Sequence, residues 1–284
     1  MRKLNINIDY LTIKNGGISG YLKERQNLIK KISKMKYDLI HAHFGLCGVI
    51  ANLQKGIPVI TTFHGGDMYL KQNSVFVLLI CWFASVLSKG NIFVNKKIPL
   101  FYKLKKYEVI PCAVDLQNFF PINKKIAKKR MNYDLTDNII LFSGSFNRSI
   151  KNATLAFKVI KKIKKRRNIK LIELKNFSRK QVNLVINSSD LLLVTSLSET
   201  GPLIVKEAMA CNIPVISTDV GDVKQIFKNV NGYYVTDYNA NTIARIVDSL
   251  ITKNIRTQGR DQIIKLGLDG NNVAKRVYEF YKTI

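Results

Sequence analysis

The chain has 284 residues, of which 46% are hydrophobic, and its 46 lysine and arginine residues against 19 aspartate and glutamate residues give a net charge of +27. This length predicts about two domains, each able to bury a sizeable core. The four cysteines lie far apart and include no Cys-x-x-Cys pair. They argue against a disulfide framework and a zinc ribbon, and they favour reduced thiols in a cytoplasmic protein.

The positive charge includes two dense basic runs, KKIAKKR at 124–130 and KKIKKRR at 161–167. A surface of this kind attracts polyanions such as nucleic acid, anionic lipid or phosphate-bearing substrates. No aromatic residues are interleaved with the runs, and no nucleic-acid-binding module is recognisable. We therefore expect contact with an anionic membrane surface rather than with nucleic acid. An AT-rich coding sequence would also explain part of the lysine content.

Short β-branched runs alternate along the chain with longer helical patterns. We predict strands at 6–13, 38–43, 58–64, 91–95, 107–111, 138–144, 169–174, 190–196 and 214–219, and helices that include 74–88, 153–167 and 202–211. This alternation indicates βαβ units and parallel sheets. The apolar run 74–88 is shorter than the ~20 residues of a membrane span, so we predict a buried helix there, with a helix that dips into a membrane as the alternative.

A change of composition divides the chain near residues 117–138, where a proline, charged residues and Asn/Asp residues separate two βα series. We place a linker at Gln117–Asn123. The prediction is an α/β chain of two Rossmann-like domains, 1–118 and 119–284, that face each other across a cleft. In such sheets ligands bind at the carboxyl ends of the strands.

The stretch SETGPLIVKEAMA, which follows the predicted strand at 190–196, contains two acids eight positions apart: Glu199, expected in a loop in the cleft, and Glu207, expected one to two turns into the helix that follows. Pro202 is favoured in the first turn of a helix, so the backbone N–H groups of Gly201 to Ile204 would lie at a helix N-terminus. Such a terminus attracts an anion such as a diphosphate. Each carboxylate can accept two hydroxyl hydrogen bonds, which suits the vicinal hydroxyls of a sugar. Alternatively, the pair is one helix acid and one surface acid.

Three further loops carry candidate residues. In LFSGSFNRSIKN, Gly144 loosens the turn, and Arg148 and Lys151 could neutralise a diphosphate leaving group. In TTFHGGD, His64 could contact a sugar hydroxyl or have a structural role. The loop IELKNFSRK, at 173–180, could line a nucleobase pocket.

The three histidines also raise the possibility of a metal site. His41 and His43 are two positions apart on a predicted strand, so they point the same way, and His64 follows the next strand. No acidic or cysteine ligand is evident beside them. We therefore expect no metal site.

Together these stretches resemble one family, the retaining glycosyltransferases of family four with the GT-B fold, also described as glycosyl transferases group 1. The resemblance covers about residues 35–284. It is carried by DLIHAHFG, PVITTFHGGD, VIPCAVDLQNFFP, LFSGSFNRSIKN, SETGPLIVKEAMACNIPVISTDVGDV and NGYYV, which occur in the order found in the family.

The resemblance implies a role for each matching residue in binding a nucleotide-sugar donor. Glu199 would contact the hydroxyls of the donor sugar, and Glu207 would bind the ribose. The diphosphate would be cradled by Gly201, Pro202, Leu203 and Ile204, with Gly144 in the neighbouring loop.

The resemblance further implies the catalytic groups. Arg148 and Lys151 would stabilise the departing diphosphate, and His64 would contact the donor sugar near the reacting carbon. Cations and the helix terminus would replace a metal ion, so no cofactor is expected beyond the UDP-, GDP- or ADP-linked donor.

Two features depart from the family pattern. Ala113 stands in IPCAVD where the family usually has glycine. The family also begins with a strand, a glycine-rich loop and a helix ahead of the strand that residues 6–13 resemble. That unit is not found in this sequence. We therefore expect an incomplete N-terminal domain.

The predicted function is transfer of a sugar, with retention, from a nucleotide sugar to a glycan or lipid-linked acceptor in surface polysaccharide synthesis. The protein would be cytoplasmic and peripheral at the inner face of the plasma membrane. Three alternatives remain: a non-catalytic nucleotide-sugar-binding remnant or subunit, a basic nucleic-acid-binding protein, and a sugar-nucleotide epimerase of the same fold.

Overall fold

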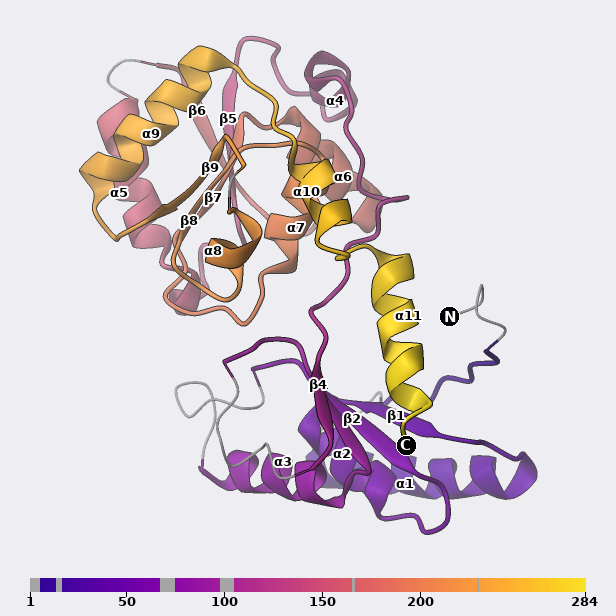
Figure 1. The fold of residues 1–284 in the computed structure, drawn as a ribbon. Coiled ribbons are helices and arrows are strands. Elements are labelled where there is room, and N and C mark those ends of the chain that lie inside the picture. Colours follow the sequence, from indigo (N-terminus) through magenta and orange to yellow (C-terminus); the bar gives the residue numbers. More distant parts are fainter. Residues whose placement is uncertain (1–5, 14–16, 67–74, 98–104, 165–166, 229) are drawn as a thin grey trace. The chain divides into compact units, whose positions relative to one another are not determined.

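The computed structural model describes residues 6–13, 17–66, 75–97, 105–164, 167–228 and 230–284 (Figure 1). The chain forms two compact α/β units, each with a parallel sheet, which confirms the predicted fold class. Unit 1 comprises Met1–Pro111 and Asn271–Ile284, and unit 2 comprises Cys112–Gly270. The division therefore falls after residue 111 rather than 118, and the last helix packs on unit 1 because its apolar side chains complete the core there.

Unit 1 contains a parallel sheet of strand order β1-β2-β3-β4. The strands are β1 (Ile40–His43), β2 (Val59–Phe63), β3 (Gly90–Phe93) and β4 (Tyr107–Val109), and the helices are α1 (Gly17–Lys34), α2 (Gly45–Asn52), α3 (Val75–Leu87) and α11 (Gly270–Tyr281). Helices α1, α2 and α3 lie side by side below the sheet in Figure 1, and α11 lies on the other face.

The alternation of side chains along β2 explains this layering. Phe63 packs with Cys81 and Ala84 of α3, whereas Ile60 packs with Phe280 of α11. Because successive strand residues point to opposite faces, each face of the sheet requires its own helical cover.

The strand predicted at 6–13 is wrong, because these residues form no regular structure. They are attached to the helical layer through side chains instead: the Tyr37 hydroxyl donates to Asp9 at 2.5 Å, and Lys31 pairs with Asp9 at 3.6 Å. β1 is the edge of its sheet in the part of the chain that the structure describes. Without a neighbouring strand, the β-branched pattern alone does not produce a strand.

The helix predicted at 74–88 is present as α3, but it is not buried as predicted. Its inner side, at Cys81 and Ala84, is fully buried, whereas Phe76 is 70% exposed and Phe83 is 53% exposed. An apolar stretch of this length gives no indication of which face is covered. None of the helices in the described ranges combines the length and apolar character that a membrane crossing requires.

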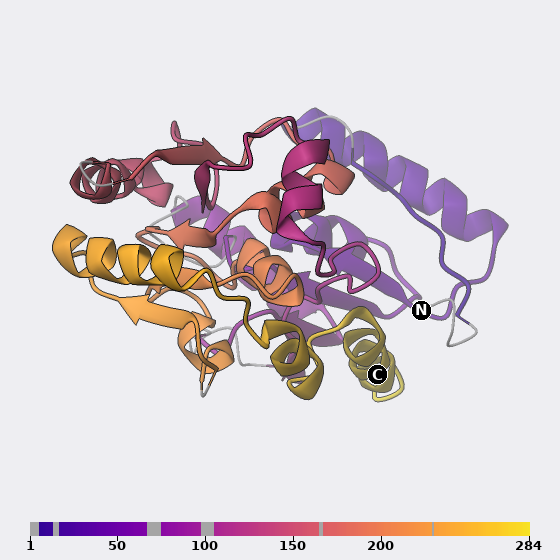
Figure 2. The ribbon, with the colours of Figure 1, turned by 90° about the horizontal axis from the view of Figure 1, so that it is seen from above.

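Unit 2 contains a parallel sheet of order β6-β5-β7-β8-β9 (Figures 1 and 2). Its strands are β5 (Asn138–Phe142), β6 (Ile169–Glu173), β7 (Leu191–Val194), β8 (Val215–Thr218) and β9 (Tyr233–Thr236). Its helices are α4 (Lys124–Arg130), α5 (Ala153–Ile163), α6 (Arg179–Ser188), α7 (Leu203–Ala210), α8 (Val223–Ile226), α9 (Ala240–Lys253) and α10 (Gly259–Lys265). A 3-10 turn, η3 (Ser149–Lys151), precedes α5. Strand β9 was not among the predicted strands, although its first three residues, Tyr233 to Val235, lie in NGYYV.

The central strands of unit 2 are covered on both faces, as their continuous apolar sequences predict. Helices α5 and α9 pack on one face, around Ile140 and Leu193. Helices α6, α7, α8 and α10 pack on the other, around Leu141 and Leu192. The two helices that follow the adjacent strands β5 and β7 therefore lie on opposite faces of the sheet.

The segment predicted as a linker, Gln117–Asn123, belongs to unit 2 and packs against it. Phe119 is fully buried in the core that contains α7. The Arg260 guanidinium donates to the Phe119 carbonyl at 2.7 Å and to the Leu116 carbonyl at 3.0 Å. A buried aromatic residue and satisfied carbonyls hold this segment in place, although its composition is typical of a linker.

Unit 1 is predicted to lose stability in mild acid because of His41, whose ring nitrogens contact Tyr281 and Thr62. Burial, followed by the neighbouring His43 and His64, lowers the pKa of His41 from 6.5 to about 3. Below pH 6.5 the unfolded chain therefore binds a proton that the folded chain refuses. By linkage this costs about 2 kcal/mol at pH 5 relative to pH 7.5.

Urea unfolding followed by the fluorescence of Trp82, the single tryptophan, measures this loss in unit 1. The difference between pH 7.5 and pH 5 should be smaller in His41→Gln than in the wild-type protein. An equal difference in both proteins would contradict this explanation.

Candidate active site

The strand order of unit 2 contains a topological switch point between β5 and β7. The chain leaves β5 toward β6 on one side and then crosses back to β7 on the other. Because α5 and α7 cover opposite faces, the loops after β5 and β7 diverge at the carboxyl edge of the sheet. Open α/β sheets bind their ligands at such a crevice.

Lys151 and Glu199 meet at this switch point. Lys151 ends η3 in the loop after β5, and Glu199 lies in the loop after β7; Lys151 Nζ is 2.5 Å from Glu199 Oε1. Both side chains are largely buried, with 10% and 18% exposure. The Ser196 hydroxyl donates to the same carboxylate oxygen at 2.8 Å. The sequence-predicted cation and acid are therefore brought together.

Gly144 leaves room for the Lys151 side chain. A Cβ at position 144 would lie 3.1 Å from Lys151 Cε and 3.3 Å from Cδ and Cγ. The lysine stem thus passes directly over the glycine at the end of β5. A side chain at this position would push the ammonium group away from Glu199.

Hydrogen bonds join the two loops. The Thr195 hydroxyl donates to the carbonyls of Lys151 and Asn152, each at 2.9 Å, and the Leu197 N–H donates to the Ile150 carbonyl at 2.9 Å. Asn152 adopts a left-handed conformation, with φ of 52°, as the chain turns from η3 into α5. The position of Lys151 is therefore fixed by the backbone of both loops.

The N-terminus of α7 adjoins this pair in the chain. Pro202 occupies the N-cap position without a capping hydrogen bond from its side chain, so α7 begins at Leu203, one residue later than predicted. The first N–H groups of a helix have no acceptor within it, and they favour an anion. Ile204 is buried, whereas Leu203 is 36% exposed. Gly201 to Ile204, predicted to cradle the diphosphate, thus lie in a loop and at a helix start, and that role stays a prediction.

Glu207 lies in the second turn of α7, as the sequence predicts, and only 3% of it is exposed. Arg179, the first residue of α6, donates to Glu207 Oε1 at 2.7 Å and stacks over Phe119 at 4.6 Å. Burial raises the pKa of Glu207, and Arg179 opposes the increase. The segment 173–180 was predicted to line a nucleobase pocket. It places the Arg179 guanidinium beside Glu207, the acid predicted to bind ribose.

A buried ion pair that was not predicted supports the Gly-Pro loop. Lys206 is completely buried, and its Nζ lies 2.8 Å from Asp222 Oδ2. The Asp222 oxygens would lie 3.4 Å from a Cβ at Gly201, so this pair is directly beneath the loop. Asp222 follows β8 in the stretch STDVGDV. Its position after the carboxyl end of a predicted strand could have marked it as a candidate site residue.

Arg148 is not brought to the Lys151–Glu199 pair by any contact. It is exposed at the start of η3, and its side chain makes no hydrogen bond or ion pair with the described residues. Its backbone carbonyl accepts from the Lys151 N–H at 2.9 Å. Its predicted role with the diphosphate stays a prediction.

His64 belongs to unit 1, where the three histidines form one row. The rings of His41 and His43 stack 4.5 Å apart, which confirms that they point the same way, and His43 Nδ1 is 3.0 Å from His64 Nε2. Burial lowers the pKa values of His43 and His64, so both favour the neutral form. In the described ranges no group of three His, Cys, Asp or Glu side chains is arranged to hold a metal ion. Asp67, of the quoted motif, lies outside these ranges.

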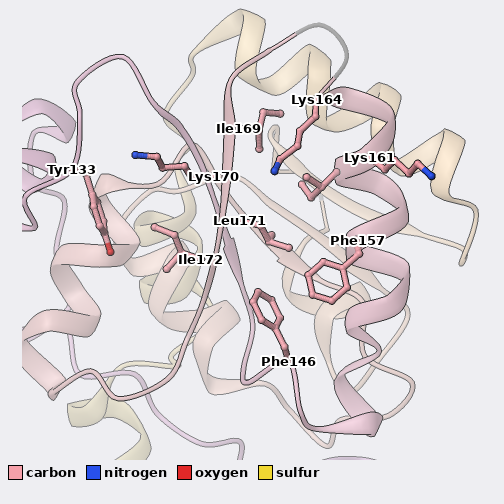
Figure 3. A pocket seen from close by; sticks show the side chains of 10 residues that line it. Tyr133, Phe146, Phe157, Lys161, Lys164, Ile169, Lys170, Leu171 and Ile172 are labelled. Atoms are coloured by element: carbon pink, nitrogen blue, oxygen red, sulfur yellow. The ribbon is translucent and has the colours of Figure 1, made fainter.

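An open groove of about 950 Å³ lies elsewhere on unit 2, along the edge strand β6 (Figure 3). Its lining includes Phe146 and Phe157, with Lys161, Lys164 and Lys170. None of the predicted site residues lines this groove. The candidate site is therefore defined by charges and loop backbone at the switch point rather than by this groove.

Comparison with known proteins shows the family of this chain. Residues 8–118 match the family model described as Glycosyltransferase Family 4, and residues 172–267 match the one described as Glycosyl transferases group 1. Over 264 residues the chain is 30% identical to an uncharacterised glycosyltransferase of Methanocaldococcus jannaschii, with 83% of this chain and 71% of that protein covered. The chain therefore belongs to glycosyltransferase family 4, the group 1 type.

Other similar proteins agree with this assignment. The chain is 25% identical over 302 residues to the UDP-Gal:alpha-D-GlcNAc-diphosphoundecaprenol alpha-1,3-galactosyltransferase of Escherichia coli, with 90% and 77% coverage. Its fold resembles Anabaena HepE in complex with UDP and glucose (TM-score 0.75, 16% identity, 100% of this chain and 88% of that chain). It also resembles sucrose-phosphate synthase of Thermosynechococcus elongatus (TM-score 0.76, 16% identity, 93% and 78%). The fold is GT-B, as predicted.

Replacing Glu207 by glutamine is predicted to stabilise the protein at neutral pH. Because burial raises the pKa of this carboxyl above 4.5, the folded protein binds the proton more tightly than the unfolded chain, and stability falls as pH rises through the folded-state pKa. Arg179, with 61% of its side chain exposed, remains hydrated without its partner. We expect the melting temperature of Glu207→Gln at pH 7 to be a few degrees higher than that of the wild type.

Scanning calorimetry at pH 7 and pH 4 checks this expectation, with the exposed Glu279→Gln as the matched control. The difference from the wild type should shrink at pH 4. A lower melting temperature at pH 7 would show that the ion pair with Arg179 outweighs the cost of burying the carboxylate.

Proposed function

We propose that this glycosyltransferase transfers a sugar from a nucleoside-diphosphate donor to a glycan or lipid-linked acceptor with retention of the anomeric configuration. The observation that carries the proposal is the Lys151–Glu199 pair at the switch point, joined through one loop to the N-terminus of α7. A cation and free N–H groups suit a diphosphate, and two carboxylates suit sugar and ribose hydroxyls.

Each residue has a place in the proposed reaction. The diphosphate lies against Gly201–Ile204 and Lys151, with Arg148 added from the same loop as Lys151. When the bond between the sugar and the diphosphate breaks, negative charge grows on the leaving group. Preorganised cations and N–H groups stabilise that charge without reorganisation, and removing one such donor typically costs about 3–4 kcal/mol of barrier.

Metal independence follows in this proposal from the charges of the site itself. Lys151 and the start of α7 face the proposed diphosphate, and Lys206 neutralises the buried Asp222 beneath Gly201. Without Lys206, a buried carboxylate beside an anion site would repel the ligand. The neutralised pair thus allows the loop to accept an anion.

The acceptor is proposed from a named relative. The Escherichia coli galactosyltransferase is described as acting on a GlcNAc-diphosphoundecaprenol, which is a lipid-linked sugar. A lipid-linked acceptor would bring this protein to the inner face of a membrane. Its charge of +27 would favour an anionic membrane surface. Synthesis of a surface polysaccharide is the process that combines these features.

Incubation with UDP-, GDP- and ADP-glucose and with UDP-galactose, in the presence of EDTA and a GlcNAc-diphosphoundecaprenol acceptor, tests this function. We expect one donor to give an α-linked product, identified by proton NMR, and Lys151→Met to lower kcat at least 100-fold. Surface lysine Lys158→Met serves as the matched control and should leave kcat unchanged.

Other outcomes distinguish the alternatives. A β-linked product would contradict retention, and dependence on added Mg²⁺ would contradict metal independence. Nucleotide binding without cleavage of any donor would indicate a non-catalytic binding protein. Conversion of the donor sugar without acceptor would indicate an epimerase, and salt-sensitive binding of DNA or RNA that is indifferent to Glu207 would indicate a nucleic-acid-binding protein.

A further inference from the structure

Helix α3 of unit 1 presents an apolar stripe to solvent. The exposed residues are Val75 (63%), Phe76 (70%), Leu79 (50%), Phe83 (53%) and Leu87 (50%). The spacing from Phe76 through Leu79 and Phe83 to Leu87 keeps these side chains on one face of the helix. No charged residue occurs within α3. Contiguous exposed apolar surface of this kind marks an interaction site.

Helix α2 runs beside α3 and extends this surface. A Cβ on Gly48 would lie 3.1 Å from the Ala84 side chain, so the two helices are in close contact there. The Asn52 amide donates to the Ser88 hydroxyl at 3.0 Å, which places the ends of α2 and α3 together. Leu53, at the end of α2, is 46% exposed. Leu53, the residue that ends α2, therefore adds an exposed apolar side chain near this end of the layer.

Helix α1 adds positive charge to the same layer, where α2 lies between α1 and α3 (Figure 1). Its basic residues are Lys23, Arg25, Lys30, Lys31 and Lys34, against a single acid, Glu24. Leu22 and Ile29, which directly precede Lys23 and Lys30, are 52% and 38% exposed.

Further cations surround the end of the apolar stripe. The Arg25 guanidinium donates to the Leu53 carbonyl at 3.5 Å, and Lys55 and Lys89 are exposed just beyond the ends of α2 and α3. Unit 1 as a whole has 20 basic and 6 acidic residues. Apolar side chains flanked by lysines are the combination that binds at the interface of an anionic bilayer.

We propose that the layer formed by α1, α2 and α3 binds the surface of an anionic lipid bilayer. The stripe from Phe76 to Leu87 enters the boundary between headgroups and acyl chains, and the lysines of α1 bind the anionic headgroups. This deepens the proposed function by assigning the surface at which a lipid-linked acceptor is reached. A second copy of the chain fits less well, because two such layers would bring like charges together.

The single tryptophan provides a direct test in the wild-type protein, because Trp82 lies in α3 with its ring 5.1 Å from the ring of Phe83. Vesicles of phosphatidylcholine with 30% phosphatidylglycerol should shift its emission to shorter wavelength. Phosphatidylcholine brominated in the acyl chains, included in the same vesicles, should quench it. Vesicles of phosphatidylcholine alone should do neither. Binding to the anionic vesicles without a change in Trp82 emission would place the contact elsewhere and overturn the proposal.

Flotation with the same vesicles tests whether Phe83 and the lysines of α1 are responsible for the binding. Phe83→Glu should lower the partition coefficient at least tenfold, whereas Phe157→Glu, at a phenylalanine 49% exposed on α5 of unit 2, should leave it unchanged. The triple change Lys23→Ala, Lys30→Ala and Lys34→Ala should weaken binding more than Lys158→Ala, Lys161→Ala and Lys164→Ala, which removes the same charge from α5 and the residue that ends it. Equal losses would show that only net charge matters, and the proposal would fail.

Light scattering with size-exclusion chromatography tests whether a second copy of the chain, rather than a bilayer, binds this surface. A dimer that Phe83→Glu dissociates, combined with no vesicle binding, would show that the stripe joins two copies and would overturn the proposal. Circular dichroism confirms that each variant is folded. Because vesicle binding is measured without donor or acceptor, its failure would leave the proposed sugar transfer untouched.

Discussion

The ion pair between Lys151 and Glu199 is the constraint around which unit 2 is organised. It can form only because two loops that diverge to opposite faces of the sheet begin on adjacent strands, β5 and β7. Gly144 lets the lysine stem pass, and Thr195 ties the two loops together through backbone carbonyls. The geometry of the pair therefore depends on strand order, on the absence of a side chain at Gly144 and on the hydrogen bonds of Thr195.

The buried charges in unit 2 indicate a site that gives up stability for binding. Glu207 keeps a carboxylate in a place where burial opposes ionisation, and Lys206 and Asp222 neutralise each other beneath the Gly-Pro loop. Buried ion pairs of this kind are often no more stabilising than apolar packing. Buried charges at the carboxyl edge of a sheet, next to a helix N-terminus, are typical of ligand-binding sites, and this is the role proposed for them.

Much of the fold could be predicted because period and composition act locally. The apolar sequences of β5, β7 and β8 require cover on both faces, and the two acids of SETGPLIVKE were correctly placed in a loop and in the second turn of a helix. The strand predicted at residues 6–13 is wrong because a strand needs a neighbouring strand to pair with, and a local sequence pattern does not show whether one is present. Gln117–Asn123 failed because its composition is that of a linker while Phe119 is core.

Long-range contacts explain what the sequence did not indicate about the site. The pairing of Arg179 with Glu207 joins residues 28 positions apart, and Asp222 reaches Lys206 from the loop after a different strand. Exposure is equally invisible in a uniformly apolar sequence, so α3 was predicted to be buried although one of its faces, with Phe76 and Phe83, is exposed. In each case the missing information is which elements become neighbours in three dimensions.

The most direct test of the account is to compare UDP with UMP by calorimetry, in the wild-type protein, Lys151→Met and Glu207→Gln, with GDP and GMP, and ADP and AMP, as further pairs. For the pair that binds, the diphosphate should bind more tightly than the monophosphate in the wild type. Lys151→Met should abolish most of that preference, whereas Glu207→Gln should weaken both ligands equally. A preference for the diphosphate that survives Lys151→Met, or no binding of any nucleotide at low salt, would contradict the assignment of the donor site to the switch point of unit 2.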